Sequence, residues 1–230
     1  MPEINPKLVF VGDSHAAALL AGATALGLDA DGVSWSGSAW HDGKFALTET
    51  GLEPRGLPAP LKAMAGLRAR LAKDTETDKG QIVVTTLGFH LGRLVPPFGW
   101  NGHQAFSSGE PRPAETDTVS QAFLRDYVQH FRARHLRVAR RWSRMVNLVI
   151  VAPPPAFSRP SYMAFRDELL FLCHQARLTV FDPSTEFQHE GGIVPAVLLE
   201  ADGVHGTTEY GARVMEAMVR NRVLDLTLPH

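Results

Sequence analysis

Short apolar runs alternate with helical patterns along the chain, and this alternation constrains the fold more than any other feature. The runs are rich in β-branched residues and are typical of buried strands. They predict five strands, at residues 8–12, 32–36, 81–86, 146–151 and 178–182. Apolar residues at helical spacing predict helices over 15–26, 58–73, 119–144, 161–177 and 207–224.

The predicted strands are apolar throughout rather than alternating, which indicates a sheet that is covered on both faces. Strands that alternate with helices form parallel sheets joined by right-handed crossovers. We therefore expect an α/β fold, a three-layer α/β/α sandwich around a five-stranded parallel sheet. The 230 residues fit one domain spanning 1–230. In such sheets, functional sites form at the carboxyl ends of the strands.

The stretch 92–118 breaks the alternation. It holds Gly, Pro, Ser and Trp without any period, and it is too long for a plain connection. It follows the end of a predicted strand, so one interpretation is a lid-like insertion over the site. The other interpretation is an irregular surface excursion without a role.

Charge and composition exclude several partners and cofactors. A net charge of −1 and a pI of about 6.8 offer nothing to nucleic acid or to an anionic membrane surface. The basic stretch Arg132–Arg144 is interleaved with apolar residues and indicates the solvated face of a helix. A single cysteine, Cys173, excludes an internal disulfide, and no histidine shows metal-ligand spacing, so we expect no metal and no cofactor.

The chain shows neither a signal sequence nor an apolar run that is long enough to span a bilayer. A cytoplasmic location is therefore expected, with no membrane partner. The oligomeric state is left open.

The first predicted strand ends in Gly12-Asp13-Ser14-His15, and a predicted helix begins at once. This arrangement exposes a serine hydroxyl at the positive end of a helix. Its backbone N–H can also donate to a developing oxyanion. Ser and Asp are common helix caps as well, so this segment taken alone indicates no more than a cap.

A second polar segment, Asp202-Gly203-Val204-His205, precedes the last predicted helix. The carboxylate can hold one ring nitrogen of the histidine and leave the other free to take a proton from a serine. Taken alone, this segment also fits a capped turn. The two segments together predict Ser14 as a nucleophile that is activated by His205 and Asp202. The other candidate acids and bases, which no spacing relates to Ser14, are Asp182, His103 and His189.

With these segments, the sequence resembles the SGNH hydrolase family of GDSL-type esterases and lipases. Gly12–His15 resembles the first family block, with His15 where many members have Leu, and 202–205 resembles the last block. Gly37 resembles the glycine of the second block, and Gly88-Phe89-His90 stands where the family has Gly-x-Asn. The resemblance implies a flavodoxin-like fold. It also implies a supporting role for Asp13 and an oxyanion hole formed by Ser14, Gly37 and the third-block residue.

His90 departs from the family pattern, in which an asparagine donates a side-chain amide to the oxyanion. An imidazole N–H could supply the same hydrogen bond, and a stronger one when protonated. Three interpretations stay open: a functional substitute, weakened catalysis, or a histidine that only packs at a strand end.

Aromatic and polar residues also fall on predicted loops near the same edge of the sheet. They suit stacking on a sugar or an aryl acyl group. The alternative is that they anchor local packing. The candidate substrate-binding residues are Trp40, Trp100 and Asn101, together with the neighbouring His41 and His103.

The sequence therefore predicts a serine hydrolase that cleaves acetyl or short-chain acyl esters of small molecules or carbohydrates through an acyl-enzyme. An alternative is an O-acyltransferase acting on a glycan hydroxyl, because the first and last blocks also resemble SGNH domains of polysaccharide O-acyltransferases. A second alternative is a non-catalytic glycan- or ligand-binding module on the same fold. A metallohydrolase is the least favoured class.

Overall fold

The computed structural model describes residues 6–73, 80–87, 89, 104–106, 118–156, 160–226 and 228. Its centre is a five-stranded sheet in the order β2-β1-β5-β8-β9, in which every neighbouring pair is parallel. This is the strand order of flavodoxin-like doubly wound folds. The strands are β1 (Lys7–Gly12), β2 (Ala30–Ser34), β5 (Gln81–Thr85), β8 (Asn147–Val151) and β9 (Thr179–Phe181).

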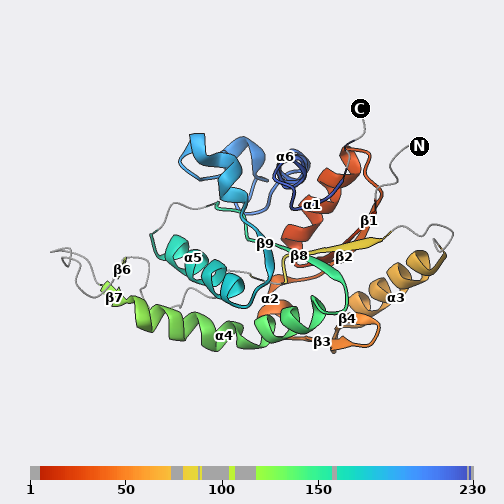
Figure 1. Cartoon of the computed structure of the whole chain (residues 1–230), viewed down its shortest axis with the longest axis horizontal. Coiled ribbons are helices and arrows are strands. Elements are labelled where there is room, and N and C mark those ends of the chain that lie inside the picture. Colours follow the sequence, from red (N-terminus) through yellow and green to blue (C-terminus); the bar gives the residue numbers. More distant parts are fainter. Residues whose placement is uncertain are drawn as a thin grey trace.

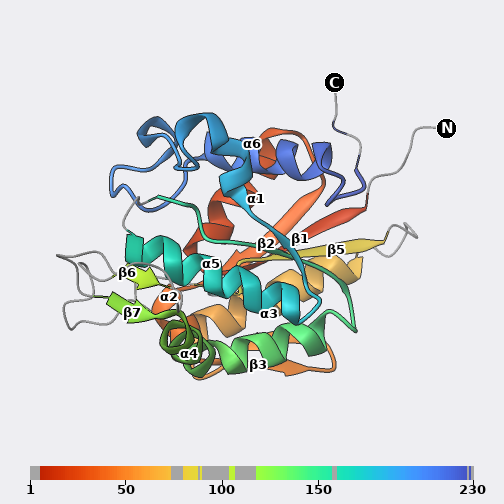
Figure 2. The same ribbon diagram turned by 60° about the vertical axis from the view of Figure 1, so that its left-hand side comes forward.

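Helices cover both faces of this sheet (Figures 1 and 2). α1 (Ser14–Ala25) and α6 (Thr208–Arg220) lie on one face. α3 (Pro58–Lys73), α4 (Gln121–Trp142) and α5 (Pro160–Gln175) lie on the other. The predicted three-layer α/β/α sandwich is thereby confirmed.

The apolar side chains of the central strands enter one of two cores, whereas the edge strand β2 contains Asp31 and the exposed Ser34 and is not apolar throughout. In β1, Val9 and Val11 pack toward α3, α4 and α5, whereas Leu8 and Phe10 pack toward α1 and α6. Period-2 alternation of side chains therefore distributes apolar residues to both faces, as a sheet buried on both sides requires.

Several short elements were not predicted, and one strand was shifted. The second strand was expected at 32–36, but β2 ends at Ser34, and Trp35 is instead buried and stacked on Trp40. The unpredicted elements are α2 (Gly37–His41), the hairpin β3 (Phe45–Thr48) and β4 (Gly51–Pro54), the parallel pair β6 (Gln104–Phe106) and β7 (Thr118–Ser120), and the 3-10 helices η3 (Pro183–Glu190) and η4 (Ala196–Leu198).

Most of the predicted lid-like insertion, 92–118, lies outside the described residues. Of this stretch the structure describes only β6 and the first residue of β7, Thr118. β6 contacts α4 and α5, so these three residues lie on the α4–α5 side of the sheet. A lid over the site stays a prediction. Within the described residues, no helix combines the length and the apolar character needed to cross a membrane.

The order of the strands reverses between β1 and β5. The chain runs from β1 outward to β2 and then returns to β5 on the other side of β1. Ligands of open α/β sheets bind at this kind of switch point, in the crevice beyond the carboxyl ends of the strands. Asp13 follows β1 and Thr86 follows β5, so the two residues face each other across the switch point.

Candidate active site

Ser14 occupies the first position of α1, directly beyond the carboxyl end of β1. Asp13 caps the helix, and its Oδ1 accepts a hydrogen bond from the N–H of His15 at 3.0 Å. Gly12 is the residue that allows this turn to lie against β5, since a Cβ there would stand 2.4 Å from Oγ1 of Thr86 and 2.7 Å from Cβ of Ala16. The turn places the Ser14 side chain at a half-buried position at the positive end of the helix.

Thr86 fixes the Asp13 turn from across the switch point. Its hydroxyl donates to Oδ1 of Asp13 at 2.8 Å and accepts from the N–H of Asp13 at 3.1 Å. Both side chains are buried, so water does not compete for these bonds. The pair holds the residue before Ser14 by its backbone and by its side chain. Asp13 and Thr86 therefore fix the turn before Ser14, and no pattern in the sequence points to Thr86. The supporting role of Asp13 in the reaction stays a prediction.

His205 lies between Ser14 and Asp202. Its Nε2 stands 2.7 Å from Oγ of Ser14, and its Nδ1 stands 2.5 Å from Oδ2 of Asp202. A carboxylate oxygen accepts, so Nδ1 donates its hydrogen to Asp202 and the lone pair of Nε2 is left to accept from the serine hydroxyl. The three side chains form a hydrogen-bonded relay in the order that a serine nucleophile requires.

The loop 202–205 is a turn built around the carboxylate of Asp202. Oδ1 accepts from the N–H of Val204 at 2.9 Å and from the N–H of His205 at 3.0 Å, and Gly203 supplies the positive φ of +66° that the turn needs. The hydrogen bond from the His205 ring, followed by these backbone bonds, holds the pKa of Asp202 far below its usual value. Asp202 is therefore ionised throughout the neutral range.

The relay is open to solvent. The side chains of His205 and Asp202 are 35% and 49% exposed.

Two helices in close contact set the distance between Ser14 and His205. α6 begins directly after the loop of His205, and it lies against α1, which begins at Ser14 (Figures 1 and 2). A Cβ on Gly22 of α1 would come within 2.1 Å of the backbone of α6, and a Cβ on Gly211 of α6 would come within 1.9 Å of the carbonyl oxygen of Ala18. The helix backbones approach closely because both positions lack side chains.

His15 lies against His205. Its ring is buried, and the ring centroids of His15 and His205 are 5.1 Å apart with an interplanar angle of 31°. The residue that departs from the first family block therefore forms one wall of the relay and restricts how the His205 ring can tilt.

The backbone N–H groups of Ser14 and Gly37 are available as donors. Neither group donates to an acceptor within the described part of the chain. Gly37 is buried at the start of α2, just beyond the end of β2. His90 and Gly88 lie outside the described residues, so the third predicted oxyanion donor stays a prediction.

Trp40 was predicted as a substrate-binding residue, and the structure contradicts this. Its side chain is fully buried, and its ring stacks on Trp35 with centroids 4.3 Å apart. A ring enclosed in the core cannot stack on a sugar, so Trp40 is a packing anchor for α2. Three other residues were predicted to bind substrate but lie outside the described residues: Trp100, Asn101 and His103.

The basic stretch of α4 is only partly a solvated face, which corrects the expectation from the sequence. Arg132 and His135 are buried beneath α2. Burial lowers the pKa of Arg132 to about 10, while the negative charge of Asp13 acts in the opposite direction. Burial also lowers the pKa of His135 to about 3, and its Nε2 lies 2.8 Å from the carbonyl oxygen of Trp40. Arg132 thus places a buried positive charge within electrostatic range of the nucleophile turn.

Two of the other candidate acids and bases, Asp182 and His189, are not part of the relay, and the third, His103, lies outside the described residues. Asp182 accepts hydrogen bonds from Arg166, and His189 belongs to η3 and makes no hydrogen bond to Ser14. Among the residues that the structure describes, no group of three His, Cys, Asp or Glu side chains is arranged to hold a metal ion.

No family model matches the chain, and no curated protein matches it by sequence. Several solved structures are similar to it. The likeness is to lipolytic proteins and acetyl xylan esterases. A protein assigned to the G-D-S-L lipolytic family of Desulfitobacterium hafniense DCB-2 is 14% identical with a TM-score of 0.46, over 94% of this chain and 99% of that one.

Two further structures show a similar degree of likeness. An acetyl xylan esterase from Geobacillus stearothermophilus is 12% identical with a TM-score of 0.47, over 95% of both chains. A lipase/acylhydrolase from Enterococcus faecalis is 13% identical with a TM-score of 0.41, over 98% of this chain and 99% of that one.

Proposed function

We propose that this chain is a serine hydrolase of carboxylic esters, a single domain of the SGNH type in which Ser14 is the nucleophile, His205 the general base and Asp202 its orienting acid. The observation that supports this most is the relay in which Nε2 of His205 lies 2.7 Å from Oγ of Ser14 while Nδ1 is held by Asp202. If the two segments were only helix caps and turns, nothing would require a histidine to bridge the serine and the carboxylate.

In the first half of the reaction, Oγ of Ser14 attacks the carbonyl carbon of the ester and its proton passes to Nε2 of His205. The negative charge of Asp202 stabilises the imidazolium that forms. The oxyanion accepts hydrogen bonds from the N–H groups of Ser14 and Gly37, and His90 is the expected third donor. When the bond to the alcohol breaks, His205 gives its proton to the departing oxygen, and an acyl ester of Ser14 remains.

In the second half, His205 takes a proton from water, and the hydroxyl attacks the acyl carbon. The bond to Oγ of Ser14 breaks, the serine recovers its proton from His205, and a carboxylic acid leaves. The exposure of Asp202 and His205 supports a substrate whose alcohol part is large, such as an acetylated or short-chain acylated carbohydrate. Small-molecule esters with the same acyl groups fit the same site.

The same open relay also admits a sugar hydroxyl in place of water, which would make the chain an O-acyltransferase. The two reactions share the acyl-enzyme and differ only in the acceptor. With an oligosaccharide added to the acyl donor, a hydrolase releases free acid at an unchanged rate. A transferase forms acylated oligosaccharide faster than it releases acid.

The test is hydrolysis of acetyl and butyryl esters by the wild type and by the variants Ser14→Ala and His205→Ala. Each substitution is expected to lower kcat by about 10⁶-fold, as in other serine hydrolases, with an unchanged circular dichroism spectrum. Ser143→Ala, which changes an exposed serine at the end of α4, is the matched control and is expected to keep full activity. Activity retained in Ser14→Ala would remove the proposed nucleophile. A folded wild type that binds oligosaccharide but cleaves no ester would identify a binding module instead.

A further inference from the structure

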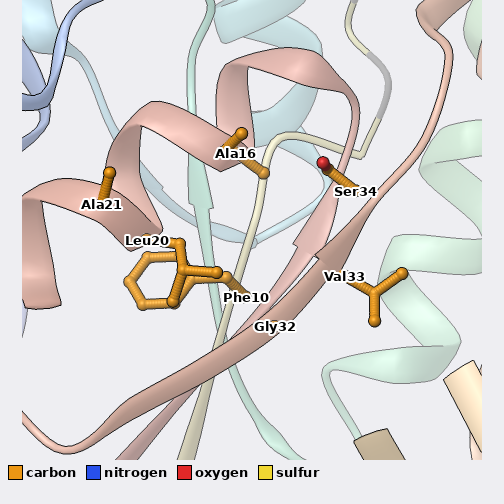
Figure 3. A pocket seen from close by; sticks show the side chains of 8 residues that line it. Phe10, Ala16, Leu20, Ala21, Gly32, Val33 and Ser34 are labelled. Carbon is orange, nitrogen blue, oxygen red and sulfur yellow. The ribbon is translucent and has the colours of Figure 1, made fainter. Parts of the chain in front are cut away.

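A cavity of about 300 Å³ lies between α1 and the edge strand β2 (Figure 3). Its walls are α1 from Ala16 to Ala21 and β2 from Gly32 to Ser34, and Phe10 of β1 lies between them. We propose that this α1–β2 cavity receives the acyl chain of the ester that acylates Ser14, and that it admits straight chains longer than acetyl. The inference rests on the proposed function, because it assigns a place to the acyl group of that reaction.

One end of the cavity lies at the level of the carboxyl end of β1. Ser34 is the register partner of Gly12, and the N–H of the following residue, Trp35, donates to the carbonyl oxygen of Gly12 at 3.1 Å. Ser34 therefore lies level with Gly12, the last residue of β1, which precedes Ser14 by two residues. On the opposite wall, Ala17 lies one turn of α1 beyond Ser14.

The cavity then extends away from Ser14 along α1. With a rise of about 1.5 Å per residue, Ala17 and Ala21 lie about 5 and about 10 Å farther along the helix axis than Ser14. Figure 3 shows Ser34 and Ala16 at one end of the cavity, and Leu20 and Ala21 at the other. In the proposed arrangement, a chain attached to Ser14 enters at the Ser34 end and extends toward Leu20.

The polarity of the lining changes in the same direction. Among the described residues that line the cavity, only Ser34 has a polar side chain, and it lies at the end that is level with the end of β1. The deeper walls are formed by Phe10, Leu20 and alanines. An acyl group has the same gradient, with a polar ester at one end and methylenes beyond it. Burial of the methylenes would be favourable, whereas a sugar ring would lose its hydrogen bonds there.

Small residues on both walls keep the cavity open and narrow. A Cβ on Gly32 would stand 2.5 Å from the carbonyl oxygen of Phe10 and 2.7 Å from its Cβ, so that the floor of the cavity has no side chain at this position. Ala17 and Ala21 present only methyl groups from α1. A volume of about 300 Å³ is at the lower limit of pockets for small organic ligands and suits a slender chain.

The test is kcat/KM for p-nitrophenyl acetate, butyrate, hexanoate and decanoate. Ala21→Leu fills the far end of the cavity, and Ala17→Leu, at an exposed helix position, narrows it nearer to Ser14. In each variant the ratio of hexanoate to acetate activity is expected to fall by about tenfold or more, since each methylene excluded from an apolar pocket costs at least about tenfold. Leu20→Ala lengthens the cavity and is expected to shift the preferred chain toward decanoate.

Ala25→Leu is the matched control, an exposed alanine on the same helix that does not line the cavity. It is expected to keep the hexanoate-to-acetate ratio of the wild type. A ratio that is unchanged in both Ala17→Leu and Ala21→Leu, with wild-type circular dichroism, would overturn the assignment of the cavity while the esterase proposal still stands. If the folded wild type cleaves no ester of any length, both proposals fall.

Discussion

At the scale of single residues, the charge of Asp202 is maintained by hydrogen bonds rather than by burial. Its carboxylate is half exposed, yet it accepts from the ring of His205 and from two backbone N–H groups. These bonds favour the ionised form and therefore lower its pKa. The same carboxylate fixes the tautomer of His205, so that Nε2 is free to accept from Ser14.

Asp202→Asn therefore tests the tautomer directly. An amide at this position can donate to Nδ1 and so favour the wrong tautomer, and kcat is expected to fall by about 10⁴-fold with little change in KM. Glu200→Gln, which removes an exposed carboxylate from the same loop, is expected to leave kcat within about twofold. Steady-state kinetics of the two variants provide the measurement. Equal kcat values for Asp202→Asn and the wild type would contradict the role of Asp202.

Thr86→Val tests the buried support of the nucleophile turn. Valine keeps the shape but leaves the N–H and Oδ1 of Asp13 without their hydroxyl partner, which is expected to lower the free energy of unfolding by about 1–3 kcal/mol. Urea denaturation gives this value, and kcat is expected to fall with it. In Thr24→Val the lost bond is exposed, and water replaces it, so little change is expected. If Thr86→Val is as stable as the wild type, the hydrogen bonds between Thr86 and Asp13 do not stabilise the turn before Ser14.

Some of these residues were predictable from the sequence and others were not. Ser14, Asp202 and His205 each lie next to a helix start, where short motifs reveal them. Thr86 and Arg132 support the turn from other elements, and a single sequence shows no relation between them and Asp13. The role of Trp40 was wrong because aromatic residues in irregular segments serve both packing and binding, and only burial separates the two.

At the scale of elements, the contact between α1 and α6 determines whether Ser14 and His205 meet. Gly22 and Gly211 allow the two backbones to touch, and the loop of His205 is continuous with α6. The apolar side of the last helix is visible in the sequence, but no pattern there singles out Gly211. A glycine is required at position 211 because α1 packs against it, and α1 lies almost two hundred residues away in the chain.

Gly211→Ala is expected to move the two helices apart. The new Cβ would stand 1.9 Å from the carbonyl oxygen of Ala18, and backbone cannot yield as a flexible side chain does. We expect a loss of about 1–3 kcal/mol in the free energy of unfolding and, from a displaced His205, a fall of about 10²-fold in kcat.

Gly66→Ala is the matched control in α3. Its Cβ would meet only Nη1 of Arg70, at 3.5 Å, so the higher helix propensity of alanine is expected to stabilise this variant by up to about 1 kcal/mol. Denaturation curves and kcat are measured for both variants. Wild-type stability and turnover in Gly211→Ala would show that the helix contact does not set the geometry of the relay.

A second link between elements joins α5 to the ends of β8 and β9. The buried guanidinium of Arg166 donates to the carbonyl oxygen of Pro153 at 3.1 Å and to the carboxylate of Asp182. Burial raises the pKa of Asp182, but the hydrogen bonds and charge of Arg166 outweigh it, so the pKa lies below its usual value. The stability from this pair is therefore complete above the unfolded-state pKa of about 3.9 and is lost as the pH falls through the lower folded-state pKa.

Asp182→Asn is expected to lower the free energy of unfolding by about 3 kcal/mol at neutral pH, because it leaves the Arg166 charge buried without its counter-ion. The difference from the wild type is expected to shrink as the pH falls below about 4. Denaturation at several pH values measures the difference in the free energy of unfolding. The control is Asp42→Asn, which removes the exposed ion pair of Asp42 with Lys44 and is expected to cost less than about 1 kcal/mol. A difference that is independent of pH would contradict the role of the ion pair.

At the scale of the whole molecule, the sheet brings together the two ends of the chain. Ser14 and His205 are 191 residues apart, and a doubly wound order with β1 at its switch point places both at one edge of the sheet. The five main helices and the strands β1, β5, β8 and β9 were predictable from their apolar patterns, whereas β2 contains Asp31 and Gly32 and its predicted range was shifted. The short α2 and the β3–β4 hairpin were not predictable, since four or five residues contain too little of any period. Their form depends on packing, of α2 and β3 against α4 and of β4 against α3.

The most direct measurement is mass spectrometry of the intact and digested protein after treatment with a fluorophosphonate probe. In an activated site, Oγ of Ser14 displaces fluoride from phosphorus and keeps the phosphonyl group. We predict a single adduct on Ser14 in the wild type, none in Ser14→Ala and a strongly slowed reaction in His205→Ala. A folded wild type without an adduct, or an adduct that persists in Ser14→Ala, would contradict the assignment of an activated serine to this relay.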